Sequence, residues 1–260
     1  MANQSWVNVC HRQSRTAQPE RIINTRNLSG HFLSPPERAN EHGHYECMVE
    51  YSGKVYLITW RGSINYPDIT EFPNDAEYRH EEIVFQPAKQ EIWSSSKLVD
   101  FGADAVLRCS HKGPYPIIKL AHPGDEFRLR IKHEFEIMKA MASVEAALPV
   151  PKIDQQPLSD EQGIFGYRLQ LLNKLEQDEL GRRLSDVKDA IECLHRAGFS
   201  HGDLNPSNVM KDNQGNIVLI DFGCAGMIGK ESSKSVPTWV YPGLLVTTDT
   251  DWKSLERFTI

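Results

Sequence analysis

Long apolar runs are absent from this 260-residue chain, and their absence bears first on where the protein works. No segment approaches the roughly eighteen consecutive apolar residues that a membrane-spanning helix needs. Residues 1–30 also lack the continuous apolar core of a secretory signal. We therefore expect no membrane span, and a soluble protein located in the cytoplasm or the nucleus.

Cysteine and net positive charge are also scarce. The five cysteines are odd in number and widely scattered, so we expect reduced thiols rather than a disulfide framework. The formal charge of -6 and the dispersed tryptophans give no reason to expect a nucleic-acid partner. The remaining composition, 40% hydrophobic and 25% charged, is that of a globular protein able to bury a core.

The first part of the chain, residues 1–94, is predicted to be an N-terminal extension. Residues 1–44 are polar and have no sustained period, which indicates irregular structure. Residues 45–60 contain two β-rich stretches around Ser52-Gly53, where glycine can take the positive φ of a tight turn, so they predict a hairpin. The segment from Pro73 to Trp93 is mixed, and its interior stays open.

Residues 95–172 predict a small mixed lobe. Two strands flank a turn that contains Gly102, and a third strand ends near Lys119. Residues 125–143 follow, with apolar side chains three and four positions apart, which predicts an amphipathic helix. A further strand is expected over residues 166–172.

Residues 173–260 predict a second lobe that begins with a charged crossing segment. Apolar positions recur at helical spacing over residues 184–197, and Gly198 is well placed to end that helix. A polar loop follows, and residues 209–223 predict a short hairpin that turns near 213–215.

Two acidic motifs lie in this second lobe, and their carboxylates stand eighteen residues apart. Asp203 lies in HGDLNPSN, and Asp221 lies in IDFG. These stretches resemble the catalytic loop and the DFG motif of the protein-kinase-like superfamily. The resemblance implies that Asp203 orients an acceptor hydroxyl, while Asn208 and Asp221 hold the Mg²⁺ that bridges the phosphates of ATP. Two unrelated acidic turns are the plain alternative, which the order and spacing of the motifs disfavour.

Three upstream residues extend the resemblance. Lys119 in PIIKLA looks like the phosphate-contacting lysine of the superfamily, and Glu134 in the following helix is its expected ion-pair partner. Gly102 stands where such proteins carry a glycine-rich loop, and its backbone amide would approach the phosphates. That loop has a single glycine here, and Asp104 would repel phosphate unless its side chain turns outward.

The resemblance implies an α+β, bilobal, protein-kinase-like fold with a β-rich N-lobe and a truncated helical C-lobe, because the chain ends at Ile260. It implies ATP and Mg²⁺ as cofactors and a hydroxyl acceptor, on protein Ser/Thr or a small molecule. Gly202 stands where many regulated protein kinases carry arginine, so activation by loop phosphorylation is not expected. Asn205 stands where protein serine/threonine kinases usually carry a lysine that steadies the γ-phosphate. This form is similar to short atypical stand-alone kinase-like proteins of the fungal type.

Two other functions stay open at this point. A catalytically weak pseudokinase that acts as a binding scaffold would explain the single-glycine turn, and reuse of the fold for a different transfer is neither supported nor excluded. His42, His44 and Cys47 form a metal-like cluster, but their spacing matches no structural zinc pattern, so a solvated loop is favoured.

Overall fold

The N-terminal part of the chain forms an antiparallel sheet. The computed structural model describes residues 30–39, 43–70, 72–74, 77–110 and 113–259. The strands of this sheet are β1 (Gly30–Phe32), β2 (Glu37–Arg38), β3 (His44–Tyr51), β4 (Lys54–Arg61) and β5 (Tyr78–Ile83), in the order β1-β3-β4-β5 with β2 also on β3. The hairpin expected over residues 45–60 is present as β3 and β4, which turn at Ser52 and Gly53 at positive φ.

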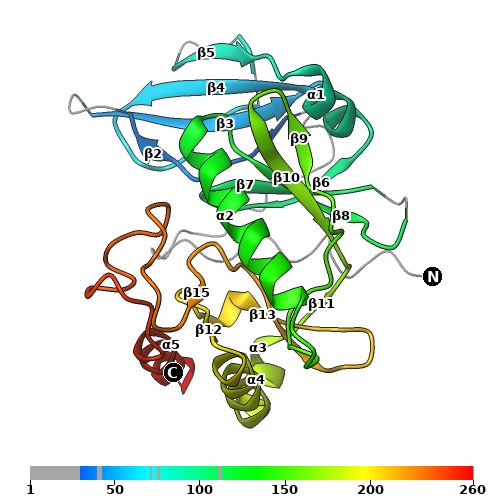
Figure 1. Ribbon diagram of the computed structural model, residues 1–260. Coiled ribbons are helices and arrows are strands. Elements are labelled where there is room, and N and C mark those ends of the chain that lie inside the picture. Colours follow the sequence, from blue (N-terminus) through cyan, green and yellow to red (C-terminus); the bar gives the residue numbers. More distant parts are fainter. Residues whose placement is uncertain (1–29, 40–42, 71, 75–76, 111–112, 260) are drawn as a thin grey trace.

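A second antiparallel sheet follows the short helix α1 (Pro87–Ser94). Its strands are β6 (Lys97–Phe101), β7 (Ala105–Cys109), β8 (Ile117–Ala121), β9 (Leu158–Asp160) and β10 (Gly163–Leu169), in the order β6-β7-β8-β10-β9. Helix α2 (Asp125–Ala142) lies against β8 and β10 (Figure 1). Its apolar stripe is buried as the sequence predicts, at Ile131, Phe135, Met138 and Met141.

The two sheets share one hydrophobic cluster. Leu33, Met48 and Trp93 of the N-terminal part pack with Ile118 and Phe165 of the second sheet. A buried ion pair joins the same two parts. The Arg108 guanidinium on β7 lies 2.8 Å from the Glu50 carboxylate on β3 and stacks on the Trp93 ring at 4.0 Å. We call residues 30–169, which hold both sheets, the upper lobe.

The lower lobe, residues 173–259, contains the remaining helices and short strands. These are β11 (Asn173–Lys174), α3 (Gln177–Arg182), α4 (Leu184–Arg196), β12 (Phe199–Ser200), the 3-10 turn η1 (Pro206–Asn208), β13 (Val209–Lys211), β14 (Ile217–Leu219), β15 (Gly226–Met227), α5 (Asp249–Leu255) and η2 (Glu256–Thr259). Helix α4 carries the buried stripe that its sequence predicts. A core cluster joins it to α2 through Met138, Leu194 and Phe222.

The mixed α+β architecture with a β-rich upper lobe is therefore confirmed. The expectation of irregular structure over residues 1–44 is wrong for β1 and β2, because strands of two or three residues show no period in the sequence. Residues 1–29 lie outside the described part, as does His42. The open segment from Pro73 to Trp93 contributes β5 and α1.

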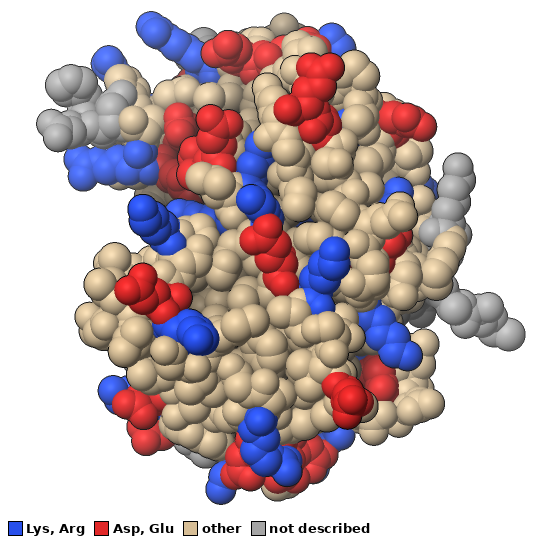
Figure 2. All heavy atoms as spheres, viewed as in Figure 1, with Lys and Arg blue, Asp and Glu red and all other residues tan. Residues whose placement is uncertain are grey.

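Charges of both signs are interspersed over the face seen in Figure 2. Within the described ranges, none of the helices combines the length and apolar character that crossing a bilayer requires. The same residues contain no group of three or more His, Cys, Asp or Glu side chains arranged to hold a metal ion.

Candidate active site

The loop that carries Asp203 is anchored from below by a buried carboxylate. Asp251, in the first turn of α5, has a relative exposure of 0%. Its oxygens accept hydrogen bonds from the backbone amides of His201 and Gly202, both at 2.8 Å. They also accept from the Ser200 hydroxyl at 3.0 Å and the His195 ring at 2.8 Å. Four donors on one carboxylate fix the loop to α5.

Glycine is required at position 202 for two reasons. Its φ is +80°, a conformation that side chains with a Cβ rarely adopt. A Cβ there would also lie 2.3 Å from the Cys224 carbonyl oxygen, in the backbone that follows the second motif. The absence of arginine from this position therefore has a local steric cause.

His201 connects the two motifs. Its Nε2 lies 2.9 Å from the Ile220 carbonyl oxygen, and its Nδ1 lies 3.3 Å from the backbone amide of Asp203. Since a carbonyl accepts and an amide donates, the ring is neutral with its proton on Nε2. The ring also packs on Phe222 with centroids 4.8 Å apart, so the loop and the residues around Asp221 are held together.

Asp203 and Asn208 lie at the two ends of the loop. The Asn208 side-chain amide donates to the Asp203 carbonyl oxygen at 2.8 Å, and the Asn208 carbonyl accepts from the Ile220 amide at 2.9 Å. Burial raises the pKa of the Asp203 carboxyl, and the negative charge of Asp221 raises that pKa further. The two carboxylates are therefore close enough to influence each other.

Lys119 lies at the centre of an ionic cluster that spans both lobes. Its Nζ lies 2.8 Å from the Glu134 carboxylate on α2 and 2.8 Å from Asp221. Burial would lower the pKa of Lys119, but the two carboxylates outweigh burial and raise it. The Lys119 ammonium in turn lowers the pKa of Asp221, whose side chain is 51% exposed. Asp221 is thus ionised and accessible.

Glu134 does more than pair with Lys119. Its Oε1 also accepts the backbone amide of Phe222 at 3.1 Å, and its carboxylate hydrogen-bonds the side chain of Tyr167 on β10. Tyr167 stands directly opposite Lys119 in the sheet register. Tyr167 could not be identified from the sequence, because its alignment with Lys119 depends on strand pairing.

The turn between β6 and β7 closes on itself. The Gly102 amide donates to the Ala105 carbonyl oxygen at 2.8 Å, so any backbone donation to phosphate would come from other amides of the turn. The Asp104 carboxylate forms an ion pair with Arg130 on α2. This pairing turns Asp104 toward the helix and neutralises it, which removes much of the repulsion expected from the sequence.

The chemistry of the donors fits ATP and Mg²⁺. Mg²⁺ prefers oxygen ligands and commonly takes one or two carboxylates, with phosphate oxygens and water as the remainder. Asp221 supplies an exposed, ionised carboxylate. The Asn208 amide nitrogen is engaged by the Asp203 carbonyl, which leaves its side-chain oxygen as the group suited to a cation. Lys119 supplies a positive charge suited to phosphate.

Comparisons with known proteins find similarity to protein kinases. The protein kinase domain family matches residues 162–252. The human protein named Hormonally up-regulated neu tumor-associated kinase is 40% identical over 90 residues, which cover 32% of this chain and 13% of that protein. Human Citron Rho-interacting kinase is 24% identical over 194 residues, which cover 63% of this chain and 9% of that protein. The chain therefore spans a small fraction of these relatives' length.

Over part of its length, this chain is therefore similar to protein kinases. The family match contains Asp203, Asn208 and Asp221. Lys119 and Glu134 lie before it, so their place in the site rests on the geometry of the ionic cluster.

Proposed function

We propose that this chain is an ATP-dependent phosphotransferase that moves the γ-phosphoryl group to a hydroxyl acceptor, on protein Ser/Thr or on a small molecule. The observation that carries the proposal is the cluster in which Lys119 lies 2.8 Å from both Glu134 and Asp221. The cluster joins the upper lobe to Asp221, which follows the Asp203 loop in the chain.

Each residue of the cluster has a distinct task in this proposal. Phosphoryl transfer depends on positioning and charge neutralisation more than on covalent help from the protein. Mg²⁺, when bound, would supply positive charge between the phosphate oxygens, and Asp221 and Asn208 would hold it. Glu134 orients Lys119 toward the phosphates. Asp203 orients the acceptor hydroxyl, and its raised pKa strengthens it as the acceptor of the hydroxyl proton.

One feature favours a protein acceptor over a small molecule. Trp239, Leu244 and Leu245 lie in the segment after Asp221 and are exposed, Trp239 at 69%. Exposed apolar side chains of one segment offer contact area to another protein. The acceptor we favour is therefore a hydroxyl on a polypeptide.

The second candidate is a pseudokinase that binds a partner without turnover. This candidate is favoured because the Gly102 amide donates to the Ala105 carbonyl within its own turn and is therefore not available to a phosphate. Nucleotide binding without transfer to any acceptor would support this candidate over the first.

The test is turnover of radiolabelled ATP against peptides, small alcohols and cell extract, with Mg²⁺. Asp203→Asn and Asp221→Ala should each lower transfer by about a hundredfold or more while the fold is kept. Asp178→Asn, at an exposed position of α3, should leave transfer unchanged. Retained activity in either of the first two variants would contradict the roles given to those residues, and a wild type that neither binds nor turns over ATP would contradict the function.

A further inference from the structure

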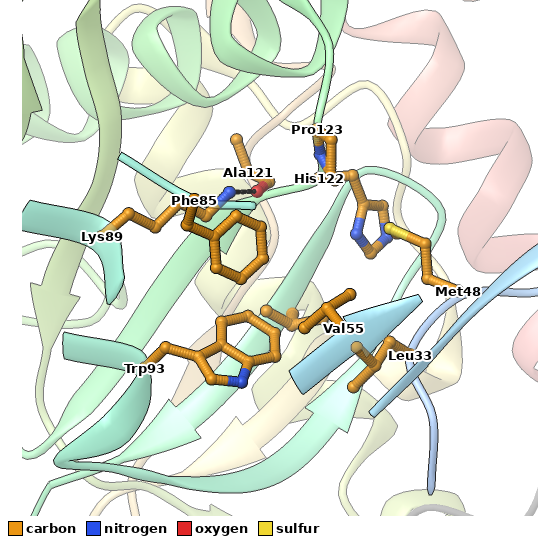
Figure 3. Close-up of a pocket in the computed structure, with 10 residues that line it drawn as sticks. Leu33, Met48, Val55, Phe85, Lys89, Trp93, Ala121, His122 and Pro123 are labelled. Atoms are coloured by element: carbon orange, nitrogen blue, oxygen red, sulfur yellow. Dashed lines mark hydrogen bonds between the residues drawn. The ribbon is translucent and has the colours of Figure 1, made fainter. Parts of the chain in front are cut away.

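A lysine lies buried between the two sheets of the upper lobe, away from the ionic cluster. Lys89 on α1 is 5% exposed, and its Nζ donates to the Ala121 carbonyl oxygen at 2.6 Å. Figure 3 shows this bond beside the Phe85 ring, whose centroid lies 4.5 Å from Nζ. The cavity there measures about 10 Å³, room for about one water molecule. Lysine is rarely buried without a charged partner, so this placement calls for an explanation.

The Ala121 carbonyl belongs to a peptide group that reaches the β6–β7 turn. The amide of the same peptide group is that of His122, and it donates to the Asp104 carbonyl oxygen at 3.0 Å. A hydrogen-bond donor on the carbonyl side polarises a peptide group and strengthens its N–H as a donor. Lys89 therefore acts on the turn through a single peptide group.

The His122 side chain holds the other half of the turn. Its Nε2 lies 2.9 Å from the Gly102 carbonyl oxygen, and a carbonyl only accepts, so Nε2 carries the proton. Burial lowers the pKa of His122 to about 4, and the ring is neutral at physiological pH. His122 thus connects the turn to the end of β8, and the Asp104–Arg130 pair connects it to α2.

We propose that Lys89 is a positioning residue of the nucleotide site, which fixes the Ala121–His122 peptide and thereby the backbone of the turn at residues 102–104. The inference rests on the proposed function, because it takes this turn to face the phosphates. It extends the site to α1, which lies far before the region that matches the protein kinase domain family. Lys89 contacts no reacting atom, so it should affect nucleotide binding and leave the rate of transfer at saturating ATP unchanged.

The experiment compares Lys89→Met, which removes the donor, with Lys89→Gln, which keeps a neutral donor. Lys97→Met, at a nearby exposed position, is the matched control. Amide hydrogen exchange of residues 101–106 is measured without nucleotide, and affinity is measured with a fluorescent ATP analogue and Mg²⁺. In Lys89→Met, exchange in the turn should accelerate about tenfold and the dissociation constant should rise about tenfold, the usual range for the loss of one hydrogen bond. Lys89→Gln should lie between that variant and the wild type.

The two readouts separate failure of the inference from failure of the function. Unchanged exchange at residues 101–106 in both Lys89 variants overturns the inference, as does faster exchange spread evenly over both sheets. If the wild type binds no nucleotide, the proposed function fails, and the exchange data still decide whether Lys89 holds the turn. If Lys89→Met does not fold, Lys89→Gln supplies the same comparison.

Discussion

Replacing Lys89 by methionine should remove a pH dependence of folding stability. Burial lowers the pKa of Lys89 from 10.5 to about 7, an effect that Arg128 reinforces and Asp160 opposes. The folded protein therefore releases this proton at a lower pH than the unfolded chain does. Between about pH 7 and 10.5 the unfolded chain binds more protons at this position, so the Lys89 contribution to stability rises with pH.

The magnitude follows from the two pKa values. Each pH unit within that window is worth about 1.4 kcal/mol, so between pH 6 and pH 9 the wild type should gain about 2.5 kcal/mol relative to Lys89→Met. Other groups titrate over this range, but they are common to both proteins and cancel in the difference.

The assay is urea unfolding followed by tryptophan fluorescence at pH 6, 7, 8 and 9. The control, Lys97→Met, should differ from the wild type by the same amount at every pH, because that side chain is exposed. A stability difference between wild type and Lys89→Met that is equal at pH 6 and pH 9 would refute the reasoning. It would mean that Lys89 keeps an ordinary pKa in the folded protein.

The remaining predictions concern the Arg108–Glu50 ion pair and Gly202. Glu50→Gln should lower the free energy of unfolding by about 3 kcal/mol, because it leaves the Arg108 charge buried without a carboxylate. Glu82→Gln, which breaks an exposed pair, should lower it by less than about 1 kcal/mol, and equal losses in the two variants would contradict this. Gly202→Ala should destabilise by roughly 2–4 kcal/mol, from its positive φ and the close backbone carbonyl. Gly243→Ala, with open space around it, is the control, and chemical denaturation that cannot separate the two glycine variants would count against the steric argument.

The sequence was most informative where a pattern is long. The helix α2 and the stripe on α4 follow from apolar spacing, and the structure confirms both. The pairing of Lys119 with Glu134 was expected from a motif, and the two side chains stand 2.8 Å apart. Their roles in transfer, with those of Gly102, Asp203, Asn208 and Asp221, stay predictions.

Contacts between residues that are far apart in the chain could not be predicted from the sequence. Arg130 neutralises Asp104 from a different element, and nothing in the spacing of the two residues indicates this. Lys89 looks like a surface lysine, because its burial depends on how one sheet covers another. The short strands β1 and β2 have no detectable period, so residues 30–38 resembled a polar lead-in.

The ion pair between Arg108 and Glu50 has a practical consequence for the design of shorter fragments of this protein. A fragment that starts at residue 95, just before β6, would carry an arginine whose counter-charge had been deleted. It would also present Ile118, Leu120 and Phe165 to solvent, side chains that the first sheet and α1 otherwise cover. A fragment made for expression should therefore include residues 30–94.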